Sequence, residues 1–283
     1  MLLHANARLH GLVPAGLLIL LLLLPLIAGC LAGNRPMKIQ PPHHFFSGAQ
    51  LELARALLEG DASRVTALAP GVDLNAPGNE GMTLLFFSLQ SAFDEKPKQL
   101  QALTALVRAG ADPAQQSPNV GSPLGVALGA EKPDYVRAFL DGGVDPDFRL
   151  QTTPILFKAA TQHSFDTLKL LIERGADVNA RDRIGGTALN EAFGSLQLDV
   201  VDYLLDHGAR PDVFDDLGVS FAYQVQRAIG RQQPGSPAHS KMQQIRDRII
   251  AMGVQWPPME PPAMRDWMRS QGMKVVVPAG HER

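Results

Sequence analysis

Two apolar residues, two further residues and a glycine form a pattern that recurs at nearly constant spacing along the chain. The four clearest copies are LVRAGADP, FLDGGVDP, LIERGADV and LLDHGARP, whose shared glycines are Gly110, Gly143, Gly175 and Gly208. These glycines lie 33, 32 and 33 residues apart. A fixed period near 33 residues is typical of stacked helical repeats, in which each unit buries its apolar face only against its neighbours.

A hydroxyl residue in a short turn opens each repeat, and its distance from the next glycine predicts where the repeats are interrupted. The spacing is 21 residues from Ser122, 22 from Thr153 and 21 from Thr187, but it is 27 from Thr83 and 33 from Ser220. The excess predicts insertions at 93–98 and 230–240, both between paired helices. The hydroxyl residue can cap the first helix, and the glycine can adopt the left-handed conformation that ends the second.

These features resemble those of ankyrin repeat proteins, whose unit begins with a Thr-Pro-Leu-His-type turn, continues through two antiparallel helices and ends in Leu-Leu-x-x-Gly-Ala-Asp-x-Asn. Residues 153–180 match best, beginning Thr-Pro-Ile-Leu and ending Gly-Ala-Asp-Val-Asn-Ala. No unit carries the family's His after the Leu, a departure that concerns local turn hydrogen bonds. The resemblance implies an all-α ankyrin-repeat solenoid of five to six helix-turn-helix units with short hairpin loops.

The expected array covers residues 48–258, with two outer units that serve as caps. Its first unit is degenerate, with helices expected over 50–59 and 62–69 and with Asp61 as the cap between them. In the last unit the second helix is expected over 242–252. The six units are expected at 48–79, 80–118, 119–150, 151–183, 184–216 and 217–258.

The amino-terminal segment has the pattern of an export signal. Arg8 is followed by an almost wholly apolar stretch over 12–27 and then by Ile-Ala-Gly-Cys ending at Cys30, the only cysteine of the chain. Residues 1–29 are therefore expected to be a signal peptide. The sequence before Cys30 resembles the lipobox of bacterial lipoproteins, which implies that the cysteine is lipidated and becomes the first residue of the mature chain.

The alternative for this segment is an uncleaved transmembrane anchor, since about 17 apolar residues just span a bilayer. Pro14 and Pro25 shorten the regular helix and favour cleavage. Leu31 follows the cysteine where an Asp would signal retention, so the enterobacterial sorting rule implies an outer-membrane lipoprotein that faces the periplasm; anchoring at the periplasmic side of the inner membrane stays open. Residues 30–47 are expected to form the lipidated cysteine and a proline-containing tether, and residues 259–283 a partly disordered tail.

Composition and motifs exclude several classes of function. The net charge of −2 and pI near 6.4 provide no basic footprint for nucleic acid. The chain contains no His-Glu-x-x-His, Gly-x-Ser-x-Gly, phosphate loop or Cys-x-x-Cys pattern. We therefore expect no catalytic residue, metal, cofactor or small-molecule substrate. The histidines that could serve as ligands are expected to be solvated or helix-end residues: His43, His44, His163 and His207. The tail methionines, which could bind a soft metal, are expected to pack onto the last repeat or to touch a partner: Met259, Met264, Met268 and Met273.

The resemblance implies that this chain binds another protein through the hairpin tips between repeats, at 111–121, 144–152, 176–186 and 209–218, and through the inner faces of the first helices. Ankyrin-like lipoproteins encoded beside type VI secretion effectors, phospholipases especially, are thought to act as immunity proteins. The first hypothesis is therefore a module that neutralises such a partner; the alternative is a scaffold for a periplasmic enzyme such as a catalase. The candidate contact residues are Gln115, Gln116, Asn119, Phe148, Arg149, Arg181, Arg183, Phe214, Asp215 and Asp216.

Overall fold

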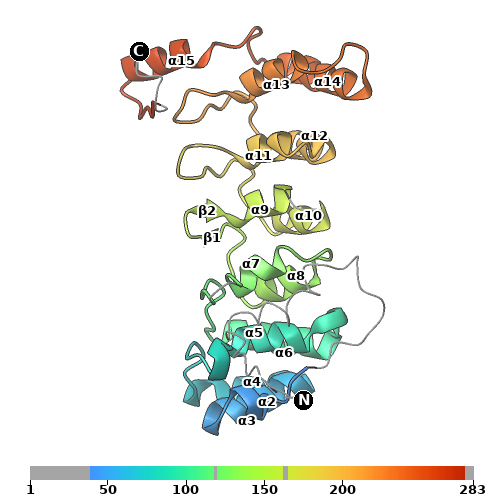
Figure 1. Ribbon diagram of the computed structural model, residues 1–283, viewed down its shortest axis with the longest axis vertical. Coiled ribbons are helices and arrows are strands. Elements are labelled where there is room, and N and C mark those ends of the chain that lie inside the picture. Colours follow the sequence, from blue (N-terminus) through green and yellow to red (C-terminus); the bar gives the residue numbers. More distant parts are fainter. Residues whose placement is uncertain (1–38, 118–119, 162–164, 278–283) are drawn as a thin grey trace, which may run out of the picture. The chain divides into compact units, whose positions relative to one another are not determined.

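The computed structural model describes residues 39–117, 120–161 and 165–277 (Figure 1). The expected signal peptide and Cys30 lie outside the described residues, as do Asn119 and His163. Within the described ranges, no helix has the length and apolar character needed to cross a membrane. The chain divides into two compact units, residues 1–144 and 145–283.

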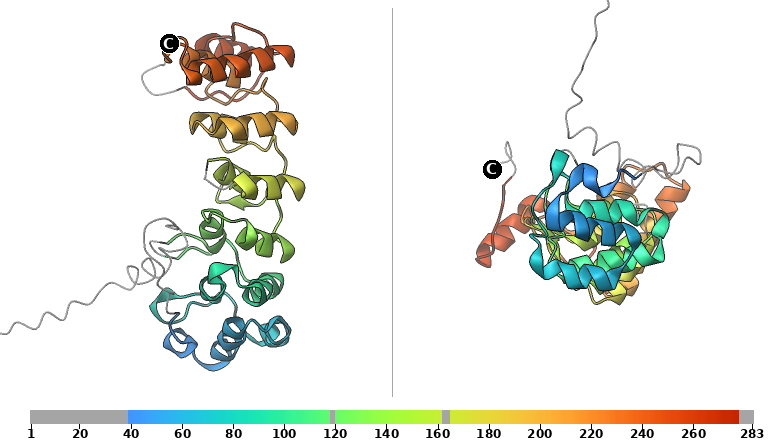
Figure 2. Two further views of the ribbon diagram at one scale, coloured as in Figure 1. Left: turned by 90° about the vertical axis from the view of Figure 1, so that its right-hand side faces the viewer. Right: turned by 90° about the horizontal axis from the view of Figure 1, so that it is seen from below.

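In the first unit, three helix pairs lie in successive layers (Figure 2). Helix α4 packs against α6, and α6 packs against α8. The bounds are α2 Pro42–Phe45, α3 Gly48–Glu59, α4 Ala62–Leu68, α5 Leu84–Ser91, α6 Pro97–Arg108, α7 Pro123–Ala127 and α8 Asp134–Asp141, with single 3-10 turns η1 Ala69–Gly71, η2 Asn79–Gly81 and η3 Phe93–Glu95.

The second unit contains three further pairs and an additional helix. A two-residue antiparallel ladder between β1 and β2 forms the stem of its first hairpin, with Arg149 opposite Pro154 and Leu150 opposite Thr153. The bounds are β1 Arg149–Leu150, β2 Thr153–Pro154, α9 Ile155–Thr161, α10 Phe165–Glu173, α11 Ala188–Gly194, α12 Leu198–Asp206, α13 Phe221–Ile229, α14 Pro237–Ala251 and α15 Pro261–Ser270. The six helix pairs of the described residues confirm the all-α ankyrin-repeat solenoid.

The helix ends form for the reasons that the repeated residues indicate. The side chains of Thr83, Ser122 and Ser220 accept hydrogen bonds from the amide of the third residue along, at 3.1–3.2 Å. These bonds satisfy amides that have no partner within the helix. The four glycines of the repeated phrase have φ angles between +88° and +104°, a region that side chains with a Cβ rarely adopt.

Apolar side chains fill the space between successive helix pairs. In the second unit Leu168, Leu171 and Leu204 are fully buried, and the ring of Phe193 meets that of Phe221 edge-on with centroids 5.4 Å apart. Burying each such side chain contributes about 1.5–3 kcal/mol, so the interfaces between repeats supply most of the favourable free energy of folding.

The amino-terminal boundary of the fold differs from the expected one. Phe45 and Phe46 are only 1% and 3% exposed, and their ring centroids lie 6.3 and 5.6 Å from that of Phe87 in α5. The backbone of Gly78 passes so close that a Cβ there would lie 2.4 Å from the carbonyl oxygen of Phe45. Phe45 and Phe46 thus cover a side of α5 that would otherwise face solvent. The tether predicted over 30–47 therefore ends before Pro42, where α2 begins.

The two insertions form ordered structure, and the second is shorter than predicted. Residues 93–95 form η3 in the first. In the second, only 230–236 are loop, since α14 begins at Pro237 and not at Met242. Ser236 caps this helix by accepting a hydrogen bond of 3.1 Å from the amide of His239, and Pro237 occupies the first helical position where its missing N–H costs nothing.

Candidate partner-binding surface

Hydrogen bonds of hairpin side chains join successive repeats of the second unit. Within the second unit, the Asp147 carboxylate accepts a hydrogen bond of 2.7 Å from the amide of Asp177. The amide group of Asn179 donates to the carbonyl oxygen of Gly208 and accepts from the amide of Arg210, at 3.0 and 2.8 Å. These bonds cross from one repeat to the next, so the hairpin tips form one preorganised surface in this unit.

Two of the predicted contact residues are part of this scaffold. The Arg149 guanidinium donates to the carbonyl oxygens of Thr152 and Arg181, both at 2.9 Å. The Arg181 guanidinium donates to the carbonyl oxygens of Gly185, at 2.9 Å, and Phe214. Both side chains remain exposed. Each arginine therefore presents a positive charge whose position the neighbouring hairpin fixes.

Asp215 has a structural role in its own turn. Its carboxylate accepts hydrogen bonds from the amides of Leu217 and Val219 at 2.9 and 2.8 Å. Burial raises the pKa of this carboxyl, and these two bonds oppose the shift. Because the Asp215 carboxylate is bonded to the backbone of its own turn, we do not expect it to contact a partner protein.

The other predicted residues vary in how freely they face solvent. Gln115 donates to the carbonyl oxygen of Asn75 at 2.6 Å and so joins two hairpins of the first unit. Gln116 is exposed and donates to the nearby carbonyl oxygen of Ala114 at 3.2 Å. Phe148 is half-buried, and the side chain of Arg183 is exposed. Gln116 and Arg183 are thus exposed to a partner, and Phe148 is partly so.

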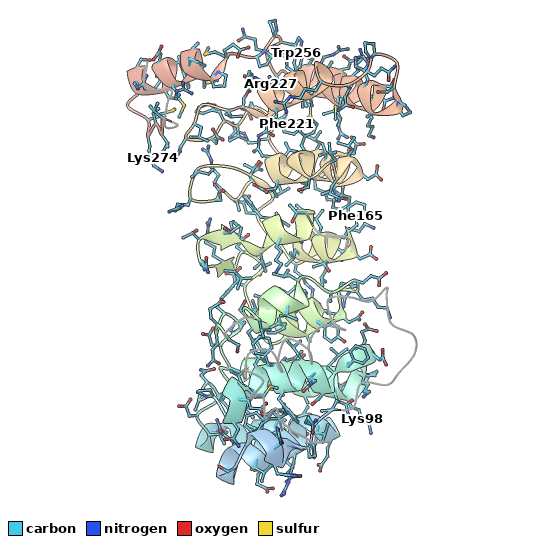
Figure 3. All side chains as sticks on the ribbon, viewed as in Figure 1. Lys98, Phe165, Phe221, Arg227, Trp256 and Lys274 are labelled. Carbon is cyan, nitrogen blue, oxygen red and sulfur yellow. The ribbon has the colours of Figure 1, made fainter. Side chains whose placement is uncertain are left out.

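The carboxyl-terminal segment 259–277 packs onto the hairpins of the second unit, as Figure 1 shows for α15. Arg265 is 6% exposed and donates to the carbonyl oxygen of Leu217 at 3.1 Å. Lys274, labelled in Figure 3, forms an ion pair with Asp216, and the amide of Val276 donates to the carbonyl oxygen of Asp216 at 2.7 Å. Asp216 is therefore occupied by the chain's own tail, a contact that the sequence did not reveal.

Four apolar side chains stay exposed on the tail and on one hairpin tip: Ile184, Trp267, Met273 and Val276. The backbone of Ile184 lies beside Asp216, since its carbonyl oxygen accepts a hydrogen bond of 2.8 Å from the Asp216 amide. Among the tail methionines, Met268 is buried, as the packing interpretation predicts, whereas Met259 and Met273 are exposed.

A groove of about 490 Å³ opens between the first helices α11 and α13 of the second unit. Phe193 and Leu196 line it from the end of α11, Met242 from α14, and Tyr223 and Arg227 from α13. Figure 3 labels Arg227 on α13. The sequence does not predict this groove; its one sequence signal is the pair of arginines at the end of α13, Arg227 in the last turn and Arg231 just beyond it.

Two of the described histidines make structural contacts. His44 lies 3.4 Å from the Glu80 carboxylate, and His207 at the end of α12 interacts with the carbonyl oxygen of Tyr203 at 2.8 Å while stacking on its ring. The described residues contain no group of three or more His, Cys, Asp or Glu side chains that could hold a metal ion.

Known proteins share this arrangement of repeats. The family model for ankyrin repeats (3 copies) matches residues 92–182 and 124–215. Protein PhlB of Serratia liquefaciens is 31% identical over 62% of this chain and 76% of its own length, and putative ankyrin repeat protein YahD of Escherichia coli K12 is 30% identical over 58% and 82%.

Two other matches bear on the fold alone. Alpha-latroinsectotoxin-Lt1a of Latrodectus tredecimguttatus is 35% identical, but over only 31% of this chain and 6% of its own length. The crystal structure of the ankyrin repeat domain of Bcl-3 superimposes with a TM-score of 0.54 at 22% identity, covering 77% of this chain and 97% of that one. The chain therefore belongs to the ankyrin repeat family, whose fold is typically a non-enzymatic module that binds other proteins.

Proposed function

We propose that this chain is a protein-binding module of the bacterial envelope that neutralises a partner protein, as an immunity protein against a type VI secretion effector such as a phospholipase. The observation that carries the proposal is the set of hydrogen bonds that join successive hairpins through Asp147, Asn179 and Arg149. A surface that is already ordered loses little conformational entropy on binding, which favours tight association.

Neutralisation would follow from occlusion of the effector's active-site entrance. A stable interface needs about 800 Å² on each partner, with a few aromatic and arginine side chains supplying most of the binding free energy. Phe148, which is partly exposed, and Arg183, which is exposed, have this chemistry and lie on neighbouring hairpins of the second unit. Such a mechanism requires no catalytic group from this chain.

Lipidation of Cys30 would hold the surface in the periplasm, where a delivered effector acts. The apolar stretch over 12–27 and the Ile-Ala-Gly-Cys sequence support export and anchoring. An outer-membrane attachment follows from Leu31 after the cysteine, so we propose that the array faces the periplasm from that membrane.

The decisive experiment is a contact competition between siblings. A strain that lacks this protein should be killed by wild-type siblings on a solid surface, and inactivating the siblings' secretion effector should abolish the killing. The wild-type gene should restore protection, a Phe148→Ala, Arg183→Ala double variant should not, and Arg137→Ala, which alters an exposed arginine of α8, should serve as the matched control. Survival of the deleted strain beside secreting siblings would contradict the proposal. If the deleted strain survived but lost the activity of a periplasmic enzyme such as a catalase, the scaffold alternative would be favoured.

A further inference from the structure

We infer that the groove between the first helices α11 and α13 takes a protein segment in which a carboxylate side chain stands beside a bulky apolar one. The inference rests on the proposed function only in that the partner is a protein. It adds the chemistry of the segment. The groove begins beside the last hairpin at Val219 and follows α13 to Arg231, just beyond the end of that helix.

The first argument is charge. The charged residues that line the groove are Arg227 and Arg231, and the lining contains no acid. Neither arginine forms an ion pair with a carboxylate in the described part of the chain; Arg227 donates only to the hydroxyl of Tyr223, at 3.2 Å. Arg227 lies in the last turn of α13 and Arg231 just beyond its end. Two arginines that line one groove attract and orient a carboxylate, because the guanidinium group binds it through two parallel hydrogen bonds.

The second argument is the conformation of Leu196. Its backbone has a φ angle of +58°, and its side chain is 64% exposed at the rim of the groove. The left-handed conformation is unfavourable for a leucine, and an exposed leucine recovers little of that cost by packing. A residue that is strained and apolar, yet contributes little to the core, is explained by contact with a partner.

The third argument is the composition of the groove floor. Phe193 and Met242 are 4% and 1% exposed, so they provide an apolar base. A bound segment would cover this base with an apolar side chain, while its carboxylate meets the two arginines. A free inorganic anion offers no apolar contact.

The test is a selection of random peptides displayed on phage against the immobilised full chain in detergent micelles. Enriched peptides should share an Asp or Glu next to Leu, Ile, Phe or Met. One enriched peptide, labelled with a fluorophore, should bind the Arg227→Glu, Arg231→Glu variant at least about tenfold more weakly, a loss equivalent to 1.4 kcal/mol or more. The Arg227→Lys, Arg231→Lys variant should retain part of the affinity, and Arg137→Glu should retain all of it.

Leu196→Asn separates a binding role from a structural one. Asn tolerates the left-handed conformation better than Leu does, so the melting temperature of this variant should be unchanged or higher while peptide affinity falls about tenfold. A lower melting temperature with unchanged affinity would show that Leu196 supports the fold and would overturn the inference.

The outcomes also distinguish this inference from the proposed function. Peptides that lose affinity with Phe148→Ala and Arg183→Ala, but not with the groove variants, would overturn the groove site and leave the hairpin surface intact. The groove site would also be overturned if the enriched peptides shared no acidic residue beside an apolar one. Sibling competition, which needs no peptide, tests neutralisation independently of both results.

Discussion

The indole ring of Trp267 in α15 meets the ring of Phe214 in the last hairpin edge-on, with centroids 5.7 Å apart and planes at 88°. Phe214 was predicted to face a partner, yet in this structure it packs against the chain's own tail. The tail therefore completes the end of the array by covering a hairpin that has no further repeat beside it. A terminal unit of a repeat array needs such a cover to remain soluble.

Trp267→Ala should loosen the tail without unfolding the repeats. The edge-on aromatic pair contributes about 0.5–1.5 kcal/mol beyond the area that it buries, and its loss leaves α15 held by the buried side chains of Arg265 and Met268. Amide hydrogen exchange should rise across 261–277 and at the hairpin around Asp216, while α9 and α11 stay protected. Arg269→Ala, which removes only an exposed pair with Asp266, is the control. Equal exchange in the two variants would contradict the docking of the tail through this ring.

Gly218→Ala should displace the tail through a steric clash. An added Cβ would lie 2.8 Å from the carbonyl oxygen of Pro261 and 2.9 Å from Cγ of Arg265, and the φ angle of +79° adds strain. Gly208→Ala has a similar φ angle of +88° but no atom within 4 Å of the new Cβ. Both variants should lose about 1–2 kcal/mol to strain, whereas only Gly218→Ala should expose the tail to limited proteolysis. Equal cleavage of the two tails would show that the contact with Pro261 is unimportant.

Phe46→Ala should destabilise the first unit by about 3–5 kcal/mol, as expected for removing a buried aromatic side chain. Its ring packs against Phe87, and the predicted tether would have left it in solvent. Urea unfolding monitored by circular dichroism measures the change. His43→Ala, an exposed neighbour in α2, should change stability by less than about 0.5 kcal/mol. If Phe46→Ala changed stability as little as His43→Ala does, Phe46 would belong to the tether and not to the folded array.

The repeats could be predicted from the sequence because their determinants are local and recur. Thr83 caps the helix that follows it, and Gly175 ends the helix before it, whatever the rest of the chain does. The contacts of Phe46 and of Trp267 could not be predicted in this way. Each occurs once, joins residues far apart in the chain and has no period to reveal it.

The candidate surface was predictable in position but not in detail. The period located the hairpins, and exposed charge identified Arg149 and Arg181 as candidates. The period does not reveal that these side chains bond to carbonyl oxygens of the next hairpin. Nor does the period reveal the groove. Its lining includes Leu196, which has an unusual backbone conformation, and Met242 of α14, and neither feature recurs along the chain.

Cys30→Ala should abolish lipidation. Metabolic labelling with an alkyne fatty acid should mark the wild-type chain and not the variant, because Cys30 is the chain's only thiol. The variant should also fractionate away from the outer membrane. A Ser47→Ala variant, changed beyond the predicted signal and at an exposed residue, should be labelled as the wild type is. Labelling of Cys30→Ala at the wild-type level would rule out this attachment site.

The hydroxyl of Tyr135 should make the stability of the first unit depend on alkaline pH. The side chain is 3% exposed, and its hydroxyl donates to the carbonyl oxygen of Ala92 at 3.3 Å. Burial raises the pKa of Tyr135 from 10.0 to about 12, because it disfavours the phenolate. The unfolded chain therefore loses this proton at a lower pH than the folded chain does. The stabilisation is complete below about pH 10 and is lost as pH rises towards 12.

Tyr135→Phe removes this titrating group while keeping the ring. At about pH 8 the variant should be less stable than the wild type by about 0.5–1.5 kcal/mol, the usual contribution of one hydrogen bond. At about pH 11 the gap should narrow, since ionisation of the unfolded state now disfavours only the wild-type fold. Urea unfolding of both proteins at the two pH values measures the gap. Tyr223→Phe, altered on the half-exposed face of α13, controls for general alkaline effects. A gap that stays constant with pH would mean that Tyr135 ionises as readily in the folded chain as in the unfolded one.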